Sequence, residues 1–214
     1  MAVKTPMLLF DFFRRNPLPQ KTPLKRQPTM NAPSSHLTTA DTLTTAVGKR
    51  AASLFSNRKL LCAEAIMVAV NDAFGQPLPD EQAVGIAAGL TAGIGDRGCL
   101  CGAIAGACAA VGMVCARGGH GPTRQAIRQQ SAAIHEAFVN RHKSACCRVL
   151  SKKVKDDAKA HAVQCAALTG YGAELAVRSI LALRPELADC PDAPTKGEPR
   201  LCGRVKWLLS LFCR

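Results

Sequence analysis

The stretch GIGDRGCLCGAIAG at residues 93–106 contains two overlapping residue patterns, and each of them could have a chemical function. Gly93, Gly95 and Gly98 have the G-x-G-x-x-G spacing of a dinucleotide-binding turn, and two cysteines follow them closely. That glycine spacing is meaningful only after a buried strand and before a helix. Here the preceding segment has apolar residues at helical spacing, and no acidic residue follows about 20 positions later to bind a ribose. We therefore expect the glycines to serve a cysteine rather than a phosphate.

Cys101 stands where this loop is expected to become a helix over about 100–116. Unpaired N–H groups and the positive end of the helix dipole stabilise a thiolate at such a position, so the sequence predicts a lowered pKa for this thiol. The glycines beside it allow backbone angles and close approaches that side chains would block. We expect Gly95, Gly98 and Gly102 to lie against a bound group.

The segment 99–116 is eighteen residues long and carries no charged side chain. That length reaches the lower limit for a membrane span, but the segment consists largely of Gly, Ala and Cys, which gain little in lipid. A buried central helix of a bundle is favoured instead. Cys108 and Cys115 continue the seven-residue spacing from Cys101, and we interpret them as small buried apolar residues.

The composition favours an all-α fold, a single compact helical bundle. Aromatic residues make up only 4% of the chain, so Ala, Leu, Val, Ile and Cys must fill the core, which suits closely packed helices. Periodicity and capping signals predict helices over about 41–56, 60–74, from Pro79 or Asp80 to the glycine-rich turn, 100–116, 122–142 and 153–183.

The net charge of +13 belongs mostly to the two ends of the chain. Residues 1–61 contain ten basic and two acidic side chains, residues 190–214 contain five and two, and the centre contains thirteen and eleven. The centre therefore lacks the basic face of a nucleic-acid-binding protein. We expect a disordered proline-rich basic tail over 1–40, a helical domain over 41–189, and a partly flexible basic tail over 190–214.

The chain has eleven cysteines and no recognisable export signal, so we expect a cytoplasmic protein with reduced thiols. In that compartment, many thiols indicate metal binding, redox chemistry or simple burial. No C-x-x-C occurs anywhere, and the usual spacings of ferredoxins and zinc knuckles are absent. His161 lies four residues before Cys165 and could share a metal with it, but a lone histidine on a charged helix is more often exposed to solvent.

Four segments in order resemble a redox-active family named for four cysteines around a Cys-Gly-Ala-x-x-Gly motif, the C_GCAxxG_C_C family. These segments are CAEAIMVAV, GLTAGIGDRGCLCGAIAGA, CCRVL and QCAALTGYGAELAV, and the likeness covers about residues 42–183. The resemblance implies a small, mostly bacterial, helical domain whose cysteines cooperate. Carried onto this sequence, the four are Cys62, Cys101, Cys147 and Cys165. Cys99 is additional, and Cys146 is an alternative to its neighbour at the third position.

Four thiols from separate helices could bind zinc or an iron–sulfur cluster, since soft thiolates select those metals. The competing chemistry is a dithiol that cycles with a disulfide and exchanges electrons with a redox partner protein, with Cys101 as attacking thiolate and Cys62 among its resolving partners. A bundle with inert buried thiols is a third interpretation.

An alternative of another class is a non-catalytic interaction protein. Its basic ends would bind a membrane surface or an acidic partner, and its cysteines would be structural. The C-terminal segment RLCGRVKWLLSLFCR has the mixture of basic and apolar residues that such surface contact requires, although it could equally pack back on the bundle.

Overall fold

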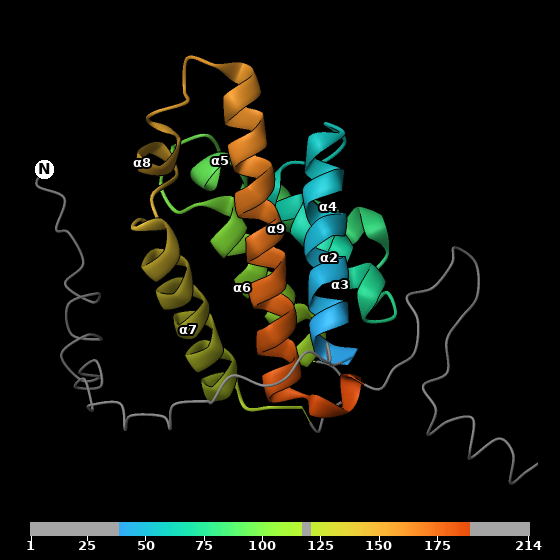
Figure 1. Cartoon of the computed structure of the whole chain (residues 1–214). Coiled ribbons are helices and arrows are strands. Elements are labelled where there is room, and N and C mark those ends of the chain that lie inside the picture. The colour runs from blue at the N-terminus through green and yellow to red at the C-terminus, as the bar shows by residue number, and fades with distance from the viewer. Residues whose placement is uncertain (1–38, 117–120, 189–214) are drawn as a thin grey trace, which may run out of the picture. The chain divides into compact units, whose positions relative to one another are not determined.

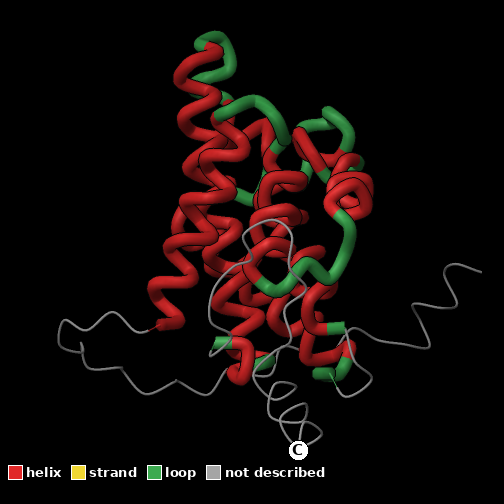
Figure 2. The backbone as a smooth tube through the Cα atoms, turned by 90° about the vertical axis from the view of Figure 1, so that its right-hand side faces the viewer, coloured by secondary structure: helices red, strands yellow, loops and turns green. Residues whose placement is uncertain are grey.

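The computed structural model of the chain describes residues 39–116 and 121–188. These residues form helices joined by short loops (Figures 1 and 2), which confirms the predicted all-α class. Within them, extended backbone pairs only at an isolated antiparallel bridge between Leu100 and Cys146. The predicted tails, including the C-terminal amphipathic segment, lie outside the described residues except for Thr39 and Ala40, which belong to the first helix.

The observed helices follow the predicted ranges closely in the first half of the domain. They are α2 (Thr39–Ser56), α3 (Cys62–Ala73), α4 (Asp80–Ala88), α5 (Thr91–Ile94), α6 (Gly102–Cys115) and α7 (Arg124–His142). The prediction of one helix from Pro79 into the glycine-rich turn is wrong in one respect. Helix α4 ends at Ala88, and the short separate helix α5 follows it. Ala92 and Gly93 inside that short helix have left-handed backbone angles, which a continuous helix cannot contain.

The second half of the domain contains α8 (Cys147–Ser151), α9 (Ala158–Leu183) and a 3-10 turn, η1 (Pro185–Leu187). The prediction of helix from residue 153 is wrong. The long helix begins five residues later because the Asp157 side chain accepts hydrogen bonds from the backbone N–H groups of Lys159 and Ala160, each at 2.9 Å. The short α8 was not predicted.

Helix α6 lies at the centre of the bundle and packs against α3, α7 and α9. Most of its side chains are buried, as predicted for its uncharged sequence. It approaches its neighbours closely at small residues: a Cβ atom built on Gly106 would lie 2.7 Å from the Cα of Ala63, and one on Gly172 of α9 would lie 2.6 Å from the carbonyl oxygen of Ala103. No helix in residues 39–116 and 121–188 is long and apolar enough to cross a membrane.

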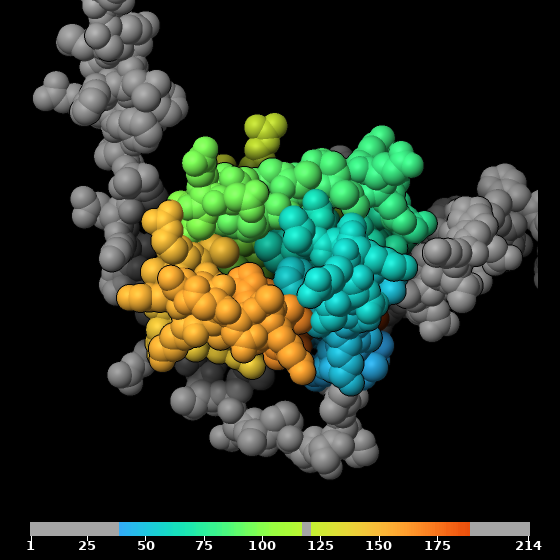
Figure 3. Space-filling model, turned by 90° about the horizontal axis from the view of Figure 1, so that it is seen from above, coloured from blue at the N-terminus to red at the C-terminus, as the bar shows by residue number. Residues whose placement is uncertain are grey.

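One end of the bundle gathers the elements that carry the predicted site. Helix α2 ends there, α9 begins there, and α5 and α8 lie beside each other at the same end, shown at the top of Figure 1. Seen from above, the surfaces of the segments around residues 60, 100 and 160 meet on this face (Figure 3). The turns that start α3 and α6 therefore open toward the same region as α8 and the first half of α9.

The Gly106→Ala substitution tests the close approach of α6 to α3. The added methyl group would meet the backbone of Ala63, which cannot move as a side chain would, so we expect the free energy of unfolding to fall by about 1–3 kcal/mol. Gly112→Ala is the matched control in the same helix, because nothing lies within 4 Å of its built Cβ; it should be neutral or stabilising by up to about 1 kcal/mol. Urea unfolding measures both, and equal effects would contradict the packing described.

Candidate functional site

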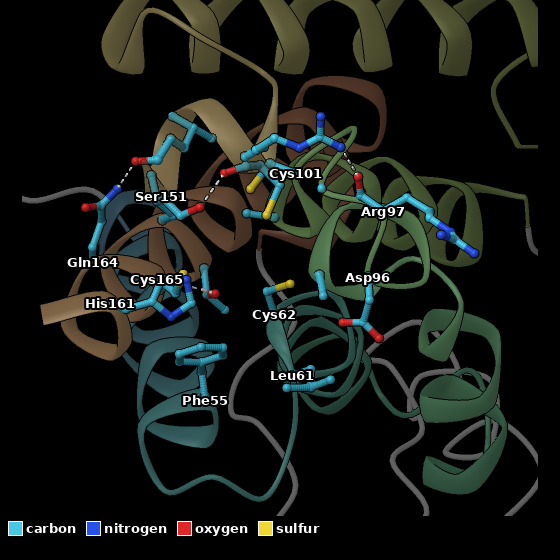
Figure 4. Close-up of a pocket in the computed structure, with 18 residues that line it drawn as sticks. Phe55, Leu61, Cys62, Asp96, Arg97, Cys101, Ser151, His161, Gln164 and Cys165 are labelled. Carbon is cyan, nitrogen blue, oxygen red and sulfur yellow. Dashed lines mark hydrogen bonds between the residues drawn. The ribbon is translucent and has the colours of Figure 1, made fainter. Parts of the chain in front are cut away.

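A cavity of about 400 Å³ opens at this end of the bundle, and all four cysteines of the predicted site line it (Figure 4). Apart from the cysteines, its wall combines apolar side chains of α2, α8, α9 and the residue before α3 with a polar rim from the glycine-rich loop and α8. The lining residues are Phe55, Leu61, Cys62, Ala92, Asp96, Arg97, Gly98, Cys101, Ala103, Cys147, Arg148, Leu150, Ser151, His161, Gln164, Cys165, Leu168 and Thr169.

Three of the four cysteines stand at the N-terminal end of a helix. Cys62 is the first residue of α3, Cys101 is the N-cap of α6, and Cys147 is the first residue of α8. Cys165 instead lies within the first half of α9. The N-terminal ends of α3 and α6 direct unpaired N–H groups and positive partial charge toward the cavity, which favours negative charge on the sulfurs.

The short helix α5 and the loop that follows it have an unusual backbone. Ala92, Ile94 and Asp96 have positive φ angles although they are not glycines, and the glycines between them do as well. A left-handed turn of this kind costs free energy at residues with a Cβ, so surrounding contacts must stabilise it. Two such contacts are backbone hydrogen bonds, in which Gly98 donates to the carbonyl of Ala92 at 3.3 Å and Cys99 donates to the carbonyl of Gly93 at 2.9 Å.

The loop is tied to the segment that precedes α8 by several hydrogen bonds. Cys101 donates its backbone N–H to the carbonyl of Ala145 at 2.8 Å, and Cys147 donates to the carbonyl of Cys99 at 2.6 Å. Arg148 adds its backbone N–H to the carbonyl of Gly98 at 3.0 Å, and its guanidinium donates to the carbonyl of Arg97 at 2.7 Å. This bridge places Cys101 and Cys147 next to each other although they are far apart in the sequence.

The glycines predicted to lie against a bound group have different surroundings. A methyl group at Gly102 would overlap the sulfur of Cys62, so the absence of a side chain there makes room for a thiol. Gly98 lines the cavity and faces the side chain of Arg148 at 3.2 Å from its built Cβ. Gly95 has open space around it and does not line the cavity.

The predicted low pKa of Cys101 is wrong for the structure described. This residue is only 5% exposed, and its burial, with a smaller contribution from Cys62, Cys147 and Cys165, raises its pKa to about 12. A backbone hydrogen bond from Ala103 opposes the shift but is the smaller effect. Desolvation therefore raises the pKa of Cys101 more than the N-terminal end of α6 lowers it. Removing a thiolate from water costs more free energy than interaction with a few N–H dipoles provides.

The pKa values of the other three cavity cysteines are also raised. Burial, together with smaller effects of Cys62 and Cys147, raises the pKa of Cys165 to about 11. Burial also raises the pKa values of Cys62 and Cys147, and the second of these is raised additionally by Cys62 and Cys146. Since each thiolate is unfavourable for its neighbours, the four sulfurs form one electrostatically coupled set.

His161 belongs to the cavity wall. The sequence analysis missed this position because it favoured a solvent-exposed side chain for this histidine. Its Nε2 atom lies 3.6 Å from the sulfur of Cys165 (Figure 4), and its side chain is half-buried. The four-residue spacing to Cys165 was the available signal, because residues i and i+4 lie on the same face of a helix. Gln164 and Ser151 also contribute, by bonding the carbonyls of Leu150 and Cys147.

Several cysteines lie outside the cavity. Cys108 is half-buried with its sulfur 3.9 Å from the carbonyl of Ser131, and Cys115 is fully buried in the core. Cys99 is exposed, and Cys146 lies beside the cavity without lining it. The structure thus places Cys147 rather than Cys146 in the cavity wall.

The sulfurs are not arranged as a single-ion site. Within residues 39–116 and 121–188, no group of three or more His, Cys, Asp or Glu side chains is positioned to hold a metal ion. The convergence of four thiolates on one zinc ion, which the sequence allows, is therefore not found in the described residues. The basic ends on which the interaction hypothesis depends lie largely outside the described residues.

Alkylation rates test the raised pKa of Cys101. In metal-free folded protein at about pH 8, iodoacetamide should modify Cys101 at least about ten-fold more slowly than exposed Cys99, because only the thiolate reacts. The rate at Cys101 should rise with pH up to about 12 in the folded chain, whereas in urea it should level off above the ordinary cysteine value of 9.0. Mass spectrometry of quenched digests measures both rates. Faster modification of Cys101 than of Cys99 would restore the low-pKa interpretation.

Comparison with known proteins agrees with the cysteine pattern. The family model described as "Putative redox-active protein (C_GCAxxG_C_C)" matches residues 60–179, more than half of the chain. That range contains the four cysteines that line the cavity and the motif formed by residues 101–106. No curated protein and no solved structure matches the chain. The chain therefore belongs to the C_GCAxxG_C_C family.

Proposed function

We propose that the protein is an electron-transfer protein whose four cavity cysteines hold a redox-active iron–sulfur centre. The observation that carries this proposal is that Cys62, Cys101, Cys147 and Cys165 line one cavity and are electrostatically coupled there. Four thiolates are the usual ligand set of such clusters. When bound, the cluster would supply one-electron transfer.

The raised pKa values of the cavity thiols support binding of a positively charged metal centre. Each buried thiol keeps its proton because a thiolate would be poorly solvated and would repel its neighbours. A metal cation displaces these protons and reverses both effects, since it attracts every thiolate at once. The N-terminal ends of α3 and α6, at Cys62 and Cys101, would then help to offset the remaining negative charge.

The wall of the cavity suits a centre shielded from water. Phe55, Leu61 and Leu168 form its apolar side, while Arg97 and Arg148 belong to its polar rim. The side chain of His161 faces Cys165, where it would orient that sulfur. Apolar surroundings and hydrogen bonds to the ligands are the features by which a protein sets the reduction potential of a cluster.

Anaerobic purification tests the proposal directly. We expect iron and acid-labile sulfide in stoichiometric amounts and a visible absorption that changes on exposure to air, because thiolate-to-iron charge transfer absorbs visible light. Cys101→Ser and Cys165→Ser should each lower the iron content severely. Cys108→Ser is the matched control, because it removes a half-buried thiol outside the cavity and should keep the iron. Zinc in place of iron, or metal-free protein with no visible absorption, would contradict the proposed centre.

A dithiol is the second candidate, because one pair of cysteines is brought together by the start of α6. The sulfur of Cys62 lies against Gly102, the residue after Cys101, and the two thiols are coupled. In this chemistry the two thiols give one disulfide, two protons and two electrons, which pass to an oxidised partner. Metal-free protein that forms a Cys62–Cys101 disulfide reversibly would favour it.

Gly102→Ala tests the site without removing a thiol. The methyl group would displace the sulfur of Cys62, and changes next to metal ligands typically lower metal affinity by roughly ten-fold or more. We therefore expect a markedly lower iron content in anaerobically purified protein. Gly112→Ala in the same helix should load like the unaltered protein. Circular dichroism shows whether both variants are folded. Full iron content in a folded Gly102→Ala variant would contradict the role of Cys62 as a ligand.

A further inference from the structure

A second cavity, of about 440 Å³, is formed by the end of α7, the segment that follows it, α8 and the first half of α9 (Figure 1). Its volume falls within the range of about 300–1,000 Å³ that is typical of small-molecule sites. Leu150, Gln164 and Leu168 line both cavities, so the two share part of one wall. None of the four cysteines of the proposed centre lines the second cavity. The proposed function therefore leaves this space unexplained.

The polar part of the second cavity carries positive charge. Lys143 and Lys153 belong to its wall, whereas none of the described residues that line it is acidic. In the part of the chain that the structure describes, neither lysine forms a salt bridge. Lys143 donates one N–H of its ammonium group to the carbonyl of Asn140 at 2.8 Å, which leaves two N–H groups for a ligand. The wall thus favours an anion.

Two neutral side chains of the same wall have unused hydrogen-bonding capacity. The Nε2 atom of His142 is buried and has no hydrogen-bond partner among the described residues. Burial, with a smaller effect of Arg141, lowers the pKa of this histidine, so its ring is neutral at pH 7 and can carry the proton on Nε2. The hydroxyl oxygen of Ser144 accepts the backbone N–H of Cys146 at 3.0 Å, and its own O–H can still donate. A ligand that accepts hydrogen bonds here would satisfy a buried group that is otherwise unpaired.

The rest of the wall is apolar and consists of Val149, Leu150, Ala167 and Leu168. Val149 is 58% exposed, so a ligand that covered it would remove apolar surface from water. An inorganic ion would leave this part of the wall uncovered. The cavity therefore suits an anion that carries an apolar body.

We propose that the second cavity binds a small amphiphilic carboxylate, of the size of a short fatty acid. Its carboxylate would accept hydrogen bonds from the ammonium groups of Lys143 and Lys153 and from Nε2 of His142. Its apolar body would cover Val149. Charge-assisted hydrogen bonds hold the head group, and burial of the body adds affinity that an inorganic anion lacks.

The test uses the full-length, anaerobically purified protein and 1-anilinonaphthalene-8-sulfonate, a fluorescent anion with an apolar aromatic body. We expect saturable binding of one dye molecule per chain and displacement of the dye by octanoate. Octanol lacks the charge and inorganic phosphate lacks the apolar body, so neither should displace the dye at the same concentration. Displacement by octanol or by phosphate as effective as that by octanoate would overturn the proposal.

Variants of the polar wall test the predicted partners of the carboxylate. Lys143→Gln and Lys153→Gln should each weaken octanoate binding by about five-fold or more, because each removes a charge-assisted hydrogen bond. His142→Phe keeps a ring against Phe138 but removes Nε2, so it should weaken binding as well. Lys159→Gln is the matched control, because this exposed lysine of α9 lines neither cavity. Unchanged binding in the first three variants would overturn the proposal.

Two substitutions in α9 distinguish the second cavity from the cysteine cavity. Ala167 is exposed and lines only the second cavity, so Ala167→Glu should abolish octanoate binding by placing a carboxylate in its wall. Ala182→Glu adds the same charge at an exposed position near the other end of the helix and should bind like the parent protein. Circular dichroism shows whether both variants are folded. Unchanged binding in folded Ala167→Glu would contradict a site in this cavity.

The outcome is independent of the proposed iron–sulfur centre, because none of these substitutions alters a cysteine. Iron content is measured in the same samples. Metal-free protein that binds octanoate in this way would count only against the iron–sulfur centre. Iron-containing protein that does not bind octanoate would count only against the second cavity as a carboxylate site.

Discussion

The close contact of α6 with α3 and α9 is the constraint on which the cavity depends. Gly106 lies directly on Ala63, and Gly172 lies on the carbonyl of Ala103. Neither pair of helices can therefore approach further without a steric clash or separate without losing contact. This packing fixes the start of α3 beside the start of α6, and it fixes Cys165 of α9 opposite them. The site is therefore a property of backbone distances set by glycines several residues away from the sulfurs.

Two opposing electrostatic effects meet at the sulfurs. The ends of α3 and α6 favour negative charge, whereas the apolar wall and the neighbouring thiols oppose it. Without a cation, the second effect dominates and the thiols remain protonated. The thiols of such a cavity resist deprotonation, but a cation that neutralises several thiolates together binds favourably. This behaviour is expected of a site for a multiply charged centre.

Much of the helical framework could be predicted from the sequence, because long amphipathic or uncharged segments have clear periodicity and clear ends. The five-residue α8 was missed since it is too short to show a period. The interruption of the helix at α5 was missed because left-handed angles at Ala92 and Ile94 leave no signature in residue type. The pKa of Cys101 was mispredicted because a helix end is local, whereas desolvation depends on residues from the whole bundle.

The order of the four cysteines along the chain has a consequence for biosynthesis. Cys62 and Cys101 emerge from the ribosome before Cys165, because the nascent chain lengthens by only about 5–20 residues per second during translation. Until α9 packs against α6, the earlier cysteines lack the wall that buries them and remain open to oxidants and stray metal ions. Assembly of the cavity is therefore the step that protects its own thiols, because the packing of α9 completes the wall around them.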